Sequence, residues 1–270
     1  MNYKSLIVAI TEVSLDRAAI DRAAALAARF DAHLTGLFIY EPPYYHYPLA
    51  YPNIADLDPE AAGGTDAATQ AARAAFESAC RAHGVETHEW RFVRGETLHT
   101  LALHARYADA MLMSGGHLAA RLAIVSSRPV ITVPEADRDR PLGRRIVLAW
   151  NASREATRAA TSALPLMVGA ERLCVLVIDS NGASQRQLGA NPGADIALYL
   201  ARHGVEAQVR HADKNTRGIA DTLLTEALEM DADLICMGAY GHSRLRELVL
   251  GGVTRDVIDA PPPVPLLLAH

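Results

Sequence analysis

The sequence has few cysteines, no long apolar run and no excess of basic residues. Its three cysteines, Cys80, Cys174 and Cys236, are scattered without metal-ligand spacing, which argues against a disulfide framework or a zinc site and predicts buried free thiols. No apolar run reaches membrane-spanning length, although 50% of the residues are hydrophobic. The net charge of −5 and the absence of a basic tract argue against nucleic acid as a partner.

Several motifs that mark enzyme classes are also missing from the sequence. It has no Gly-Lys-Ser/Thr string and so no P-loop lysine, no Gly-x-Ser-x-Gly and no His-Glu-x-x-His. P-loop kinase, hydrolase and protease interpretations therefore have no support, and we assign no catalytic residue and no metal ligand. The N-terminus shows no signal-peptide pattern, so a cytoplasmic location is the expectation.

An internal repeat is the first positive feature of the chain. Residues 7–39 align with residues 146–178 at a constant offset of 139 without a gap. Each copy shows an apolar strand, a turn ending in Ser14 or Ser153 as a helix cap, an alanine-rich helix and a second apolar strand. We therefore predict two copies of one domain, residues 1–137 and residues 138–270.

Within each copy, strands and helices alternate. Five strands with crossover helices between them predict an α/β, Rossmann-like domain, in which a mostly parallel sheet carries helices on both faces. The expected strands of the first copy are 3–10, 33–40, 86–93, 109–114 and 129–134, with helices at 14–31, 64–83, 96–107 and 118–126. Those of the second are 144–150, 172–178, 205–211, 233–238 and 264–269.

A glycine-rich segment in the second copy follows a strand and precedes a helix. Met237–Gly241 comes directly after an apolar run, and Gly251–Thr254 opens the helical stretch 255–258. Glycine lets a backbone approach a ligand closely, and the free amides and positive dipole end of a helix start favour an anion. Loop glycines can also serve only as turn and cap residues. With the hydroxyl of Thr254, the segment predicts a phosphate cradle.

The pattern Gly-x2-Gly-x9-Gly-Gly-Val-Thr, after a strand and before a helix, resembles the nucleotide-binding signature of the universal stress protein family. The resemblance implies that this loop holds the phosphates of ATP, with or without Mg, although some members of the family bind no nucleotide. AMP, ADP and cyclic AMP stay open as ligands. The resemblance also implies that the ligand lies in a crevice between the first and fourth strands. Gly252 departs from the pattern, because many ATP-binding members have Ser or Thr there.

The resemblance places the nucleoside near the ends of the first two strands of the second copy. Asn151 stands where the family usually has an aspartate. Val177 and Ile178 form either an apolar edge for the base or simply strand core, and Trp150 either stacks on adenine or packs between domains. The full predicted binding set is Ala149, Trp150, Asn151, Val177, Ile178, Met237, Gly238, Gly241, His242, Gly251, Gly252, Val253 and Thr254.

The first copy lacks a counterpart of Gly251–Thr254, so we expect ATP in the C-terminal domain only. Residues 40–52 instead collect five tyrosines and four prolines, as a binding surface or as a loop folded over its own domain. The resemblance implies an ATP-binding stress-response protein that signals through nucleotide-linked changes. The alternatives are a scaffold that binds no nucleotide and recognises a partner through residues 40–52, or a weak ATP hydrolase.

The last strand of each copy is apolar and would invite pairing if exposed. These segments are Val130–Val133 and Pro265–Leu268. Single-domain stress proteins often dimerise along this strand, so the resemblance implies that the two copies pair with each other as a pseudo-dimer. Further association into a homodimer stays open.

Overall fold

The computed structural model describes residues 2–11, 17–42, 67–135, 141–179, 191–214, 218–240, 252–259 and 264–270. The elements of the first half are β1 (Ser5–Thr11), α1 (Arg17–Phe30), β2 (His33–Tyr40), α3 (Ala67–His83), β3 (His88–Arg94), α4 (Thr97–Ala105), β4 (Ala110–Met113), α5 (Gly116–Ser126) and β5 (Val130–Thr132). Those of the second half are β6 (Arg145–Ala149), α6 (Arg154–Val168), β7 (Arg172–Asp179), α8 (Ala194–Arg202), β8 (Gln208–Asp213), α9 (Ile219–Glu229), β9 (Leu234–Gly238), α10 (Gly252–Asp259) and β10 (Leu266–Ala269).

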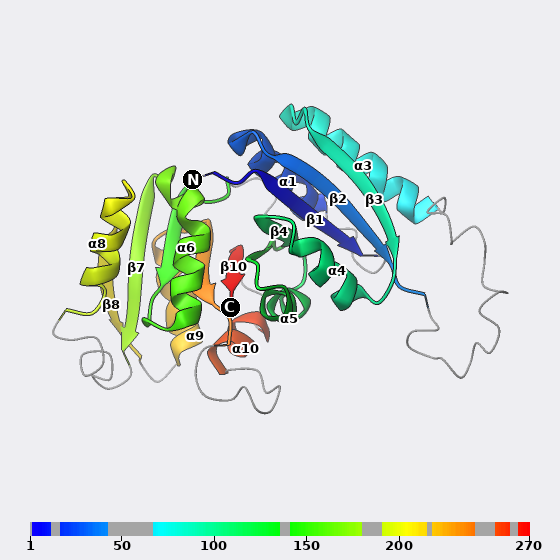
Figure 1. The fold of residues 1–270 in the computed structure, drawn as a ribbon. Coiled ribbons are helices and arrows are strands. Elements are labelled where there is room, and N and C mark those ends of the chain that lie inside the picture. The colour runs from blue at the N-terminus through cyan, green and yellow to red at the C-terminus, as the bar shows by residue number, and fades with distance from the viewer. Residues whose placement is uncertain are drawn as a thin grey trace, which may run out of the picture.

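All of these strands join one sheet, in the order β3-β2-β1-β4-β5-β10-β9-β6-β7-β8 (Figure 1). Every pair within a half is parallel, so the predicted α/β class is confirmed. The predicted strands agree closely with the observed ones. The largest shift is at the strand predicted to begin at 205, which begins at Gln208 because Val205 still belongs to the turn after α8.

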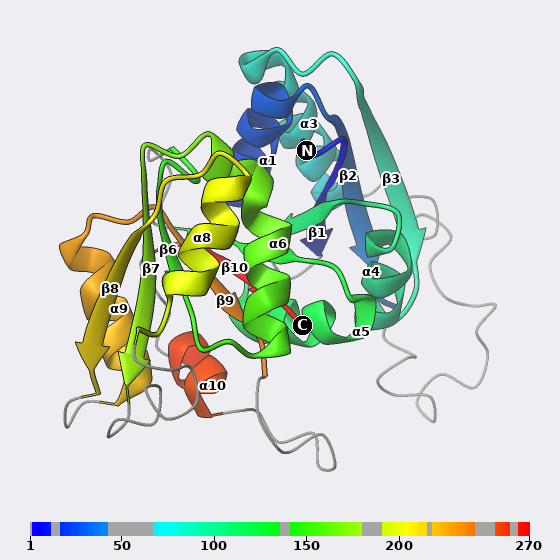
Figure 2. The same ribbon diagram turned by 60° about the vertical axis from the view of Figure 1, so that its left-hand side comes forward.

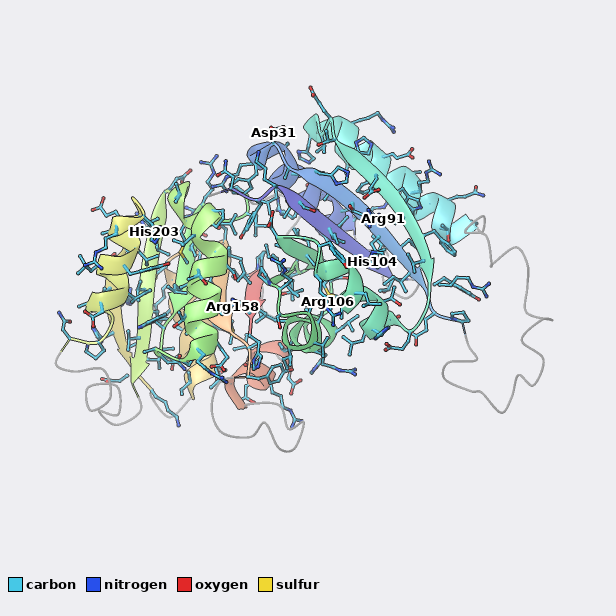
Figure 3. All side chains as sticks on the ribbon, in the orientation of Figure 1. Asp31, Arg91, His104, Arg106, Arg158 and His203 are labelled. Carbon is cyan, nitrogen blue, oxygen red and sulfur yellow. The ribbon has the colours of Figure 1, made fainter. Side chains whose placement is uncertain are left out.

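Burial follows the position of each strand in the sheet. The strands β4 and β10 are buried at every residue, whereas every residue of the edge strand β3 is exposed or half-buried. Helices α1, α3, α6 and α8 cover one apolar core, which we call the first core. Helices α4, α5, α9 and α10 cover the second core on the opposite face. Charged side chains such as Arg91 and His203 lie on the outside of the molecule (Figure 3).

The two halves meet along β5 and β10, which pair antiparallel with Ile131 opposite Leu267. The predicted pairing of the last strands is thereby confirmed. On the side of α1, the Tyr3 hydroxyl donates to the Ser162 carbonyl at 2.7 Å, and Arg29 donates to the Leu142 carbonyl at 3.1 Å. Because β5 and β10 are antiparallel, the carboxyl ends of the strands lie at opposite edges of the sheet in the two halves.

An aspartate at the same place in each half ties two strands together. The Asp109 carboxylate accepts hydrogen bonds from the backbone amides of Lys4 and Ser5, at the start of β1. Asp233 is buried and accepts from the amides of residues 143–145, at the start of β6. The Ala-Asp dipeptide that occurs in both copies of the sequence therefore has the same structural role in each half: its carboxylate holds the first strand beside the fourth.

The three cysteines are free and buried, as predicted. Burial raises the pKa of the Cys80 and Cys174 thiols to about 11, and that of Cys236 further, which keeps them protonated at neutral pH.

Within the described ranges, no helix combines the length and apolar character needed to cross a membrane. The same residues contain no group of three or more His, Cys, Asp or Glu side chains that could hold a metal ion.

Candidate functional site

The strand order of the second half reverses between β6 and β9, which lie side by side in parallel. In open α/β sheets, ligands bind beyond the carboxyl ends of the strands at such a reversal. The two strands end at Ala149 and Gly238, both in the predicted binding set. The first and fourth strands of the second half are β6 and β9, so the expected position of the ligand coincides with the reversal of strand order.

The turn from β6 into α6 is held by local hydrogen bonds. The Asn151 side-chain oxygen accepts from the Ser153 amide at 3.1 Å, and Ala152 adopts a positive φ of 56°. The Ser153 hydroxyl then accepts from the Ala156 amide at 3.1 Å, which confirms the predicted helix cap. Asn151 is exposed, so its amide nitrogen can still donate to a ligand.

Gly238 packs against the first turn of α6. A Cβ atom at this position would lie 2.7 Å from the Ala156 nitrogen and 2.7 Å from the Glu155 carbonyl carbon. Glycine is therefore required here for close contact between strand and helix. The sequence interpretation had assigned this glycine to ligand approach, and it did not anticipate the helix contact.

Glu155 is a charged group at the site that the sequence interpretation missed. Its side chain is only 7% exposed and interacts with Arg154 at 3.2 Å. Burial alone would raise its pKa, but hydrogen bonds from its own amide and Ser153, and the charges of Arg154 and His270, hold the pKa below its usual value. An ionised carboxylate in the first turn of α6 repels an anion from that helix start. The sequence could have indicated this residue, because acidic side chains are favoured in the first turn of a helix that begins after a Ser cap.

The start of α10 is open by comparison. Gly252 is exposed, and no atom of the described residues lies within 4 Å of the place where its Cβ would be. The first turn of α10 contains no acidic residue. Thr254 is buried, and its hydroxyl oxygen accepts from the Tyr240 amide at 3.1 Å, which ties α10 to the end of β9. The amides of this helix start are thus accessible to an anion, with the helix dipole in their favour.

The predicted binding residues divide between the two faces of the sheet. Ala149, Met237, Ile178 and Val253 pack on the second core, together with Tyr240. Trp150 packs against the first core instead, so its ring lies in a packed layer. Gly241, His242 and Gly251 lie outside the described residues.

Val177 belongs to the strand interior. It is 1% exposed, and its Cγ2 atom lies 3.3 Å from the place where a Cβ on Gly193 would be. Ile178, the next residue, is half-buried on the opposite face. The two side chains therefore do not form one apolar edge, and only Ile178 lies on the face of the second core.

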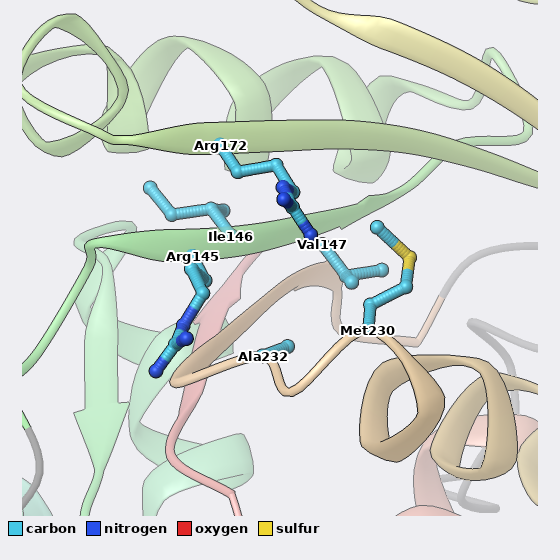
Figure 4. A pocket seen from close by; sticks show the side chains of 6 residues that line it. All are labelled: Arg145, Ile146, Val147, Arg172, Met230 and Ala232. Atoms are coloured by element: carbon cyan, nitrogen blue, oxygen red, sulfur yellow. The ribbon is translucent and has the colours of Figure 1, made fainter.

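A small indentation of about 140 Å³ lies elsewhere, at the amino ends of β6 and β7 (Figure 4). Its lining residues are Arg145, Ile146, Val147, Arg172, Met230 and Ala232. Arg145 forms an ion pair with Asp231 at 2.9 Å. The indentation is at the edge of the sheet opposite to Gly238 and Gly252, and we do not include it in the candidate site.

Comparisons with known proteins agree with this architecture. The model of the universal stress protein family matches residues 143–268. This second half of the chain belongs to the universal stress protein family. The matched residues run from the turn before β6 to β10, and so include the whole candidate site. A search of curated proteins gives no match.

Solved structures extend the likeness to both halves. A universal stress protein from Archaeoglobus fulgidus DSM 4304 has a TM-score of 0.74 at 16% identity, covering 98% of each chain. A protein of unknown function from Pseudomonas aeruginosa PAO1 has a TM-score of 0.62 at 16% identity, covering 99% of this chain and 92% of that one. A universal stress protein in complex with cAMP covers 50% of this chain and 99% of its own, with a TM-score of 0.37 at 20% identity. At such identities the likeness to the two longer chains shows the fold alone.

Proposed function

We propose that the protein is an ATP-binding universal stress protein in which the second half alone, residues 138–270, holds the nucleotide. The observation that carries the proposal is the open start of α10 beside the reversal of strand order. Exposed Gly252 leaves the backbone approachable there, and no acidic side chain of the first turn opposes a phosphate. The family to which residues 143–268 belong supports the same assignment.

The residues around this helix start fit a nucleotide in most respects. Thr254 holds α10 against the end of β9, so the amides of the first turn have a fixed position relative to the sheet. Asn151 offers a donor at the end of β6, where a ribose or base would lie. Glu155 opposes a phosphate at the start of α6, which directs the phosphates toward α10. The apolar contacts of the base would come from the side of Ile178 and Ala149.

The proposed role is binding linked to signalling. Residues 239–251 connect β9 to α10, so a nucleotide at the start of α10 changes the surface that this connection presents to a partner. No residue of the described site is placed as a nucleophile or as a general base for phosphoryl transfer. Mg would neutralise part of the phosphate charge when bound.

Substitution of Gly252 offers a test that separates binding from folding. Gly252→Asp places a carboxylate in open space at a helix start, where it stabilises the helix dipole but repels a phosphate. Gly252→Asn is the matched neutral control. We expect ATP to stabilise the wild type by about 2.7 kcal/mol at 100 times its dissociation constant. The Asn variant should keep most of this shift, and the Asp variant should lose it without losing stability.

Other outcomes point to the other functions. No stabilisation of the wild type by ATP, ADP, AMP or cyclic AMP would favour a scaffold that binds partners through residues 40–52, most of which lie outside the described ranges. Phosphate release above background that disappears in Gly252→Asp would indicate a weak ATP hydrolase. Equal ATP binding by the wild type and the Asp variant would show that the cradle is misassigned.

A further inference from the structure

Helix α5 of the first half lies against α10 of the second half, and two contacts join the start of α5 to the end of α10. The His117 Nε2 atom lies 3.0 Å from an Asp259 carboxylate oxygen. A Cβ on Gly116 would lie 2.6 Å from the Ile258 side chain. The start of α5 therefore meets the end of α10 on the second core, near the C-terminus (Figures 1 and 2).

Arg121 lies one turn further along α5 than His117. Arg121 is exposed and follows His117 by four residues, so the two share a face of α5. Arg121 lies near enough to Tyr240, at the end of β9, for its charge to act on the phenol. The first half thus carries a cation alongside the helix that opens at the proposed phosphate site.

Tyr240 lies just after β9 and next to the first turn of α10. It is the last described residue before the connection to α10, with a positive φ of 60°, and its amide is bonded to Thr254. Its hydroxyl oxygen is buried and has no hydrogen-bond partner within the part of the chain that the structure describes. Burial raises the pKa of Tyr240 and Arg121 lowers it, so the phenol stays protonated and lies in the field of that arginine.

A buried hydroxyl without a partner is unusual in folded proteins, and it points to a group that is supplied from outside the chain. The hydroxyl can donate one hydrogen bond, and the guanidinium can donate two in a fork. Both suit the oxygens of a phosphate group, which accept strong charge-assisted hydrogen bonds.

We propose that Arg121 of the first half and Tyr240 of the second form a phosphate subsite across the seam between the halves. The subsite rests on the proposed function, because it takes the outer phosphates of the nucleotide whose inner phosphate lies at the start of α10. It makes the first half a contributor to the binding site of the second. It also predicts a preference for ATP over AMP, since AMP has no outer phosphate to reach the seam.

The test is a set of isothermal titrations of the full chain with ATP, AMP and tripolyphosphate in the presence of Mg. Arg121→Gln should weaken ATP binding about tenfold, the size of one charge-assisted hydrogen bond, and leave AMP binding within twofold of wild type. Arg121→Lys should restore part of the affinity for ATP. Tyr240→Phe should weaken ATP binding severalfold with little effect on AMP. The matched control is Arg81→Gln, which removes an exposed charge from α3 on the other face of the sheet and should change neither affinity.

The results distinguish the two proposals. If the wild type binds ATP and Arg121→Gln binds it equally well, the subsite is wrong and the proposed function stands. If tripolyphosphate binds through Arg121 but no adenine nucleotide binds, the subsite stands and the proposed function is wrong. If the wild type binds neither ATP nor tripolyphosphate, both are overturned. Unfolding midpoints equal to that of the wild type show that the variants report on binding.

Discussion

The two halves of the chain share one scaffold and differ at one connection. Both have the strand order 3-2-1-4-5, and both use an aspartate, Asp109 or Asp233, to tie the fourth strand to the first. In the first half only residues 114–115 separate β4 from α5, and Gly116 packs onto Ile258. In the second half, residues 239–251 separate β9 from α10, and a Cβ on Gly252 would meet no atom of the described residues within 4 Å.

The difference concerns what each helix start meets. The start of α5 is covered by the end of α10, because the antiparallel pairing of β5 and β10 brings those two helix ends together. Among the residues that the structure describes, none comes within 4 Å of the place where a Cβ of Gly252, at the start of α10, would be. In our proposal, a duplicated scaffold keeps its core while one copy binds the ligand and the other copy contributes a side chain to the site.

We expect the largest difference in the free energy of unfolding when Asp233 and Asp109 are each replaced by alanine. Asp233→Ala leaves three backbone amides without their acceptor at a buried place, which should lower the free energy of unfolding by about 4 kcal/mol. Asp109→Ala should cost about 1 kcal/mol, because the Lys4 amide is exposed and water can replace the carboxylate. Urea denaturation of both variants measures the difference. Equal losses would mean that burial does not distinguish the two bonds.

The next largest difference in stability should come from substitutions at Gly238 and Ser114, which lie at the start of the two connections that differ between the halves. Gly238→Ala adds a Cβ that would lie 2.7 Å from backbone atoms of α6, and we expect a loss of about 2 kcal/mol. Ser114→Ala puts the same residue at the corresponding position of the first half, directly after β4, where a Cβ is already present, so it should cost less than about 1 kcal/mol. Thermal unfolding of the two variants checks this. A tolerated alanine at 238 would show that α6 does not require glycine there.

The seam between the halves provides a smaller effect. Tyr3 is 3% exposed and donates to the Ser162 carbonyl of α6 at 2.7 Å. Tyr3→Phe should lower the free energy of unfolding by about 1 kcal/mol, the usual value of one such hydrogen bond. Tyr107→Phe is the control, since that side chain is 86% exposed. If the two variants are equally stable, the Tyr3 hydroxyl does not hold the halves together.

The smallest effect concerns the charge at the start of α6. Because the pKa of Glu155 is held below its ordinary 4.5, the ionised carboxylate stabilises the fold above that pH, and the contribution is lost as pH falls through the lower folded value. Glu155→Gln removes this dependence. Urea midpoints at pH 7 and at pH 3 should therefore differ less in the variant than in the wild type. A steeper acid loss in the variant would contradict the assigned direction.

Much of this architecture could be predicted from the sequence, because the spacing of apolar residues and the positions of glycines can be recognised within short segments of the chain. The repeat predicted two α/β units, and the apolar strands 130–133 and 265–268 indicated the pairing between them. Other features depended on tertiary packing. Trp150 enters the first core and Val177 the strand interior, because alternate residues of a strand face opposite sides of the sheet. Glu155 and Arg121 approach the site only through α6 and α5, which sequence spacing around the glycines does not show.

The central claim is that one half of the chain binds ATP and the other does not. Its most direct test is the stoichiometry of ATP binding to the full chain by isothermal titration, with Gly252→Asp and Gly252→Asn beside the wild type. We predict one ATP per chain for the wild type and the Asn variant, and none for the Asp variant. Two ATP per chain, or one that survives Gly252→Asp, would contradict the claim.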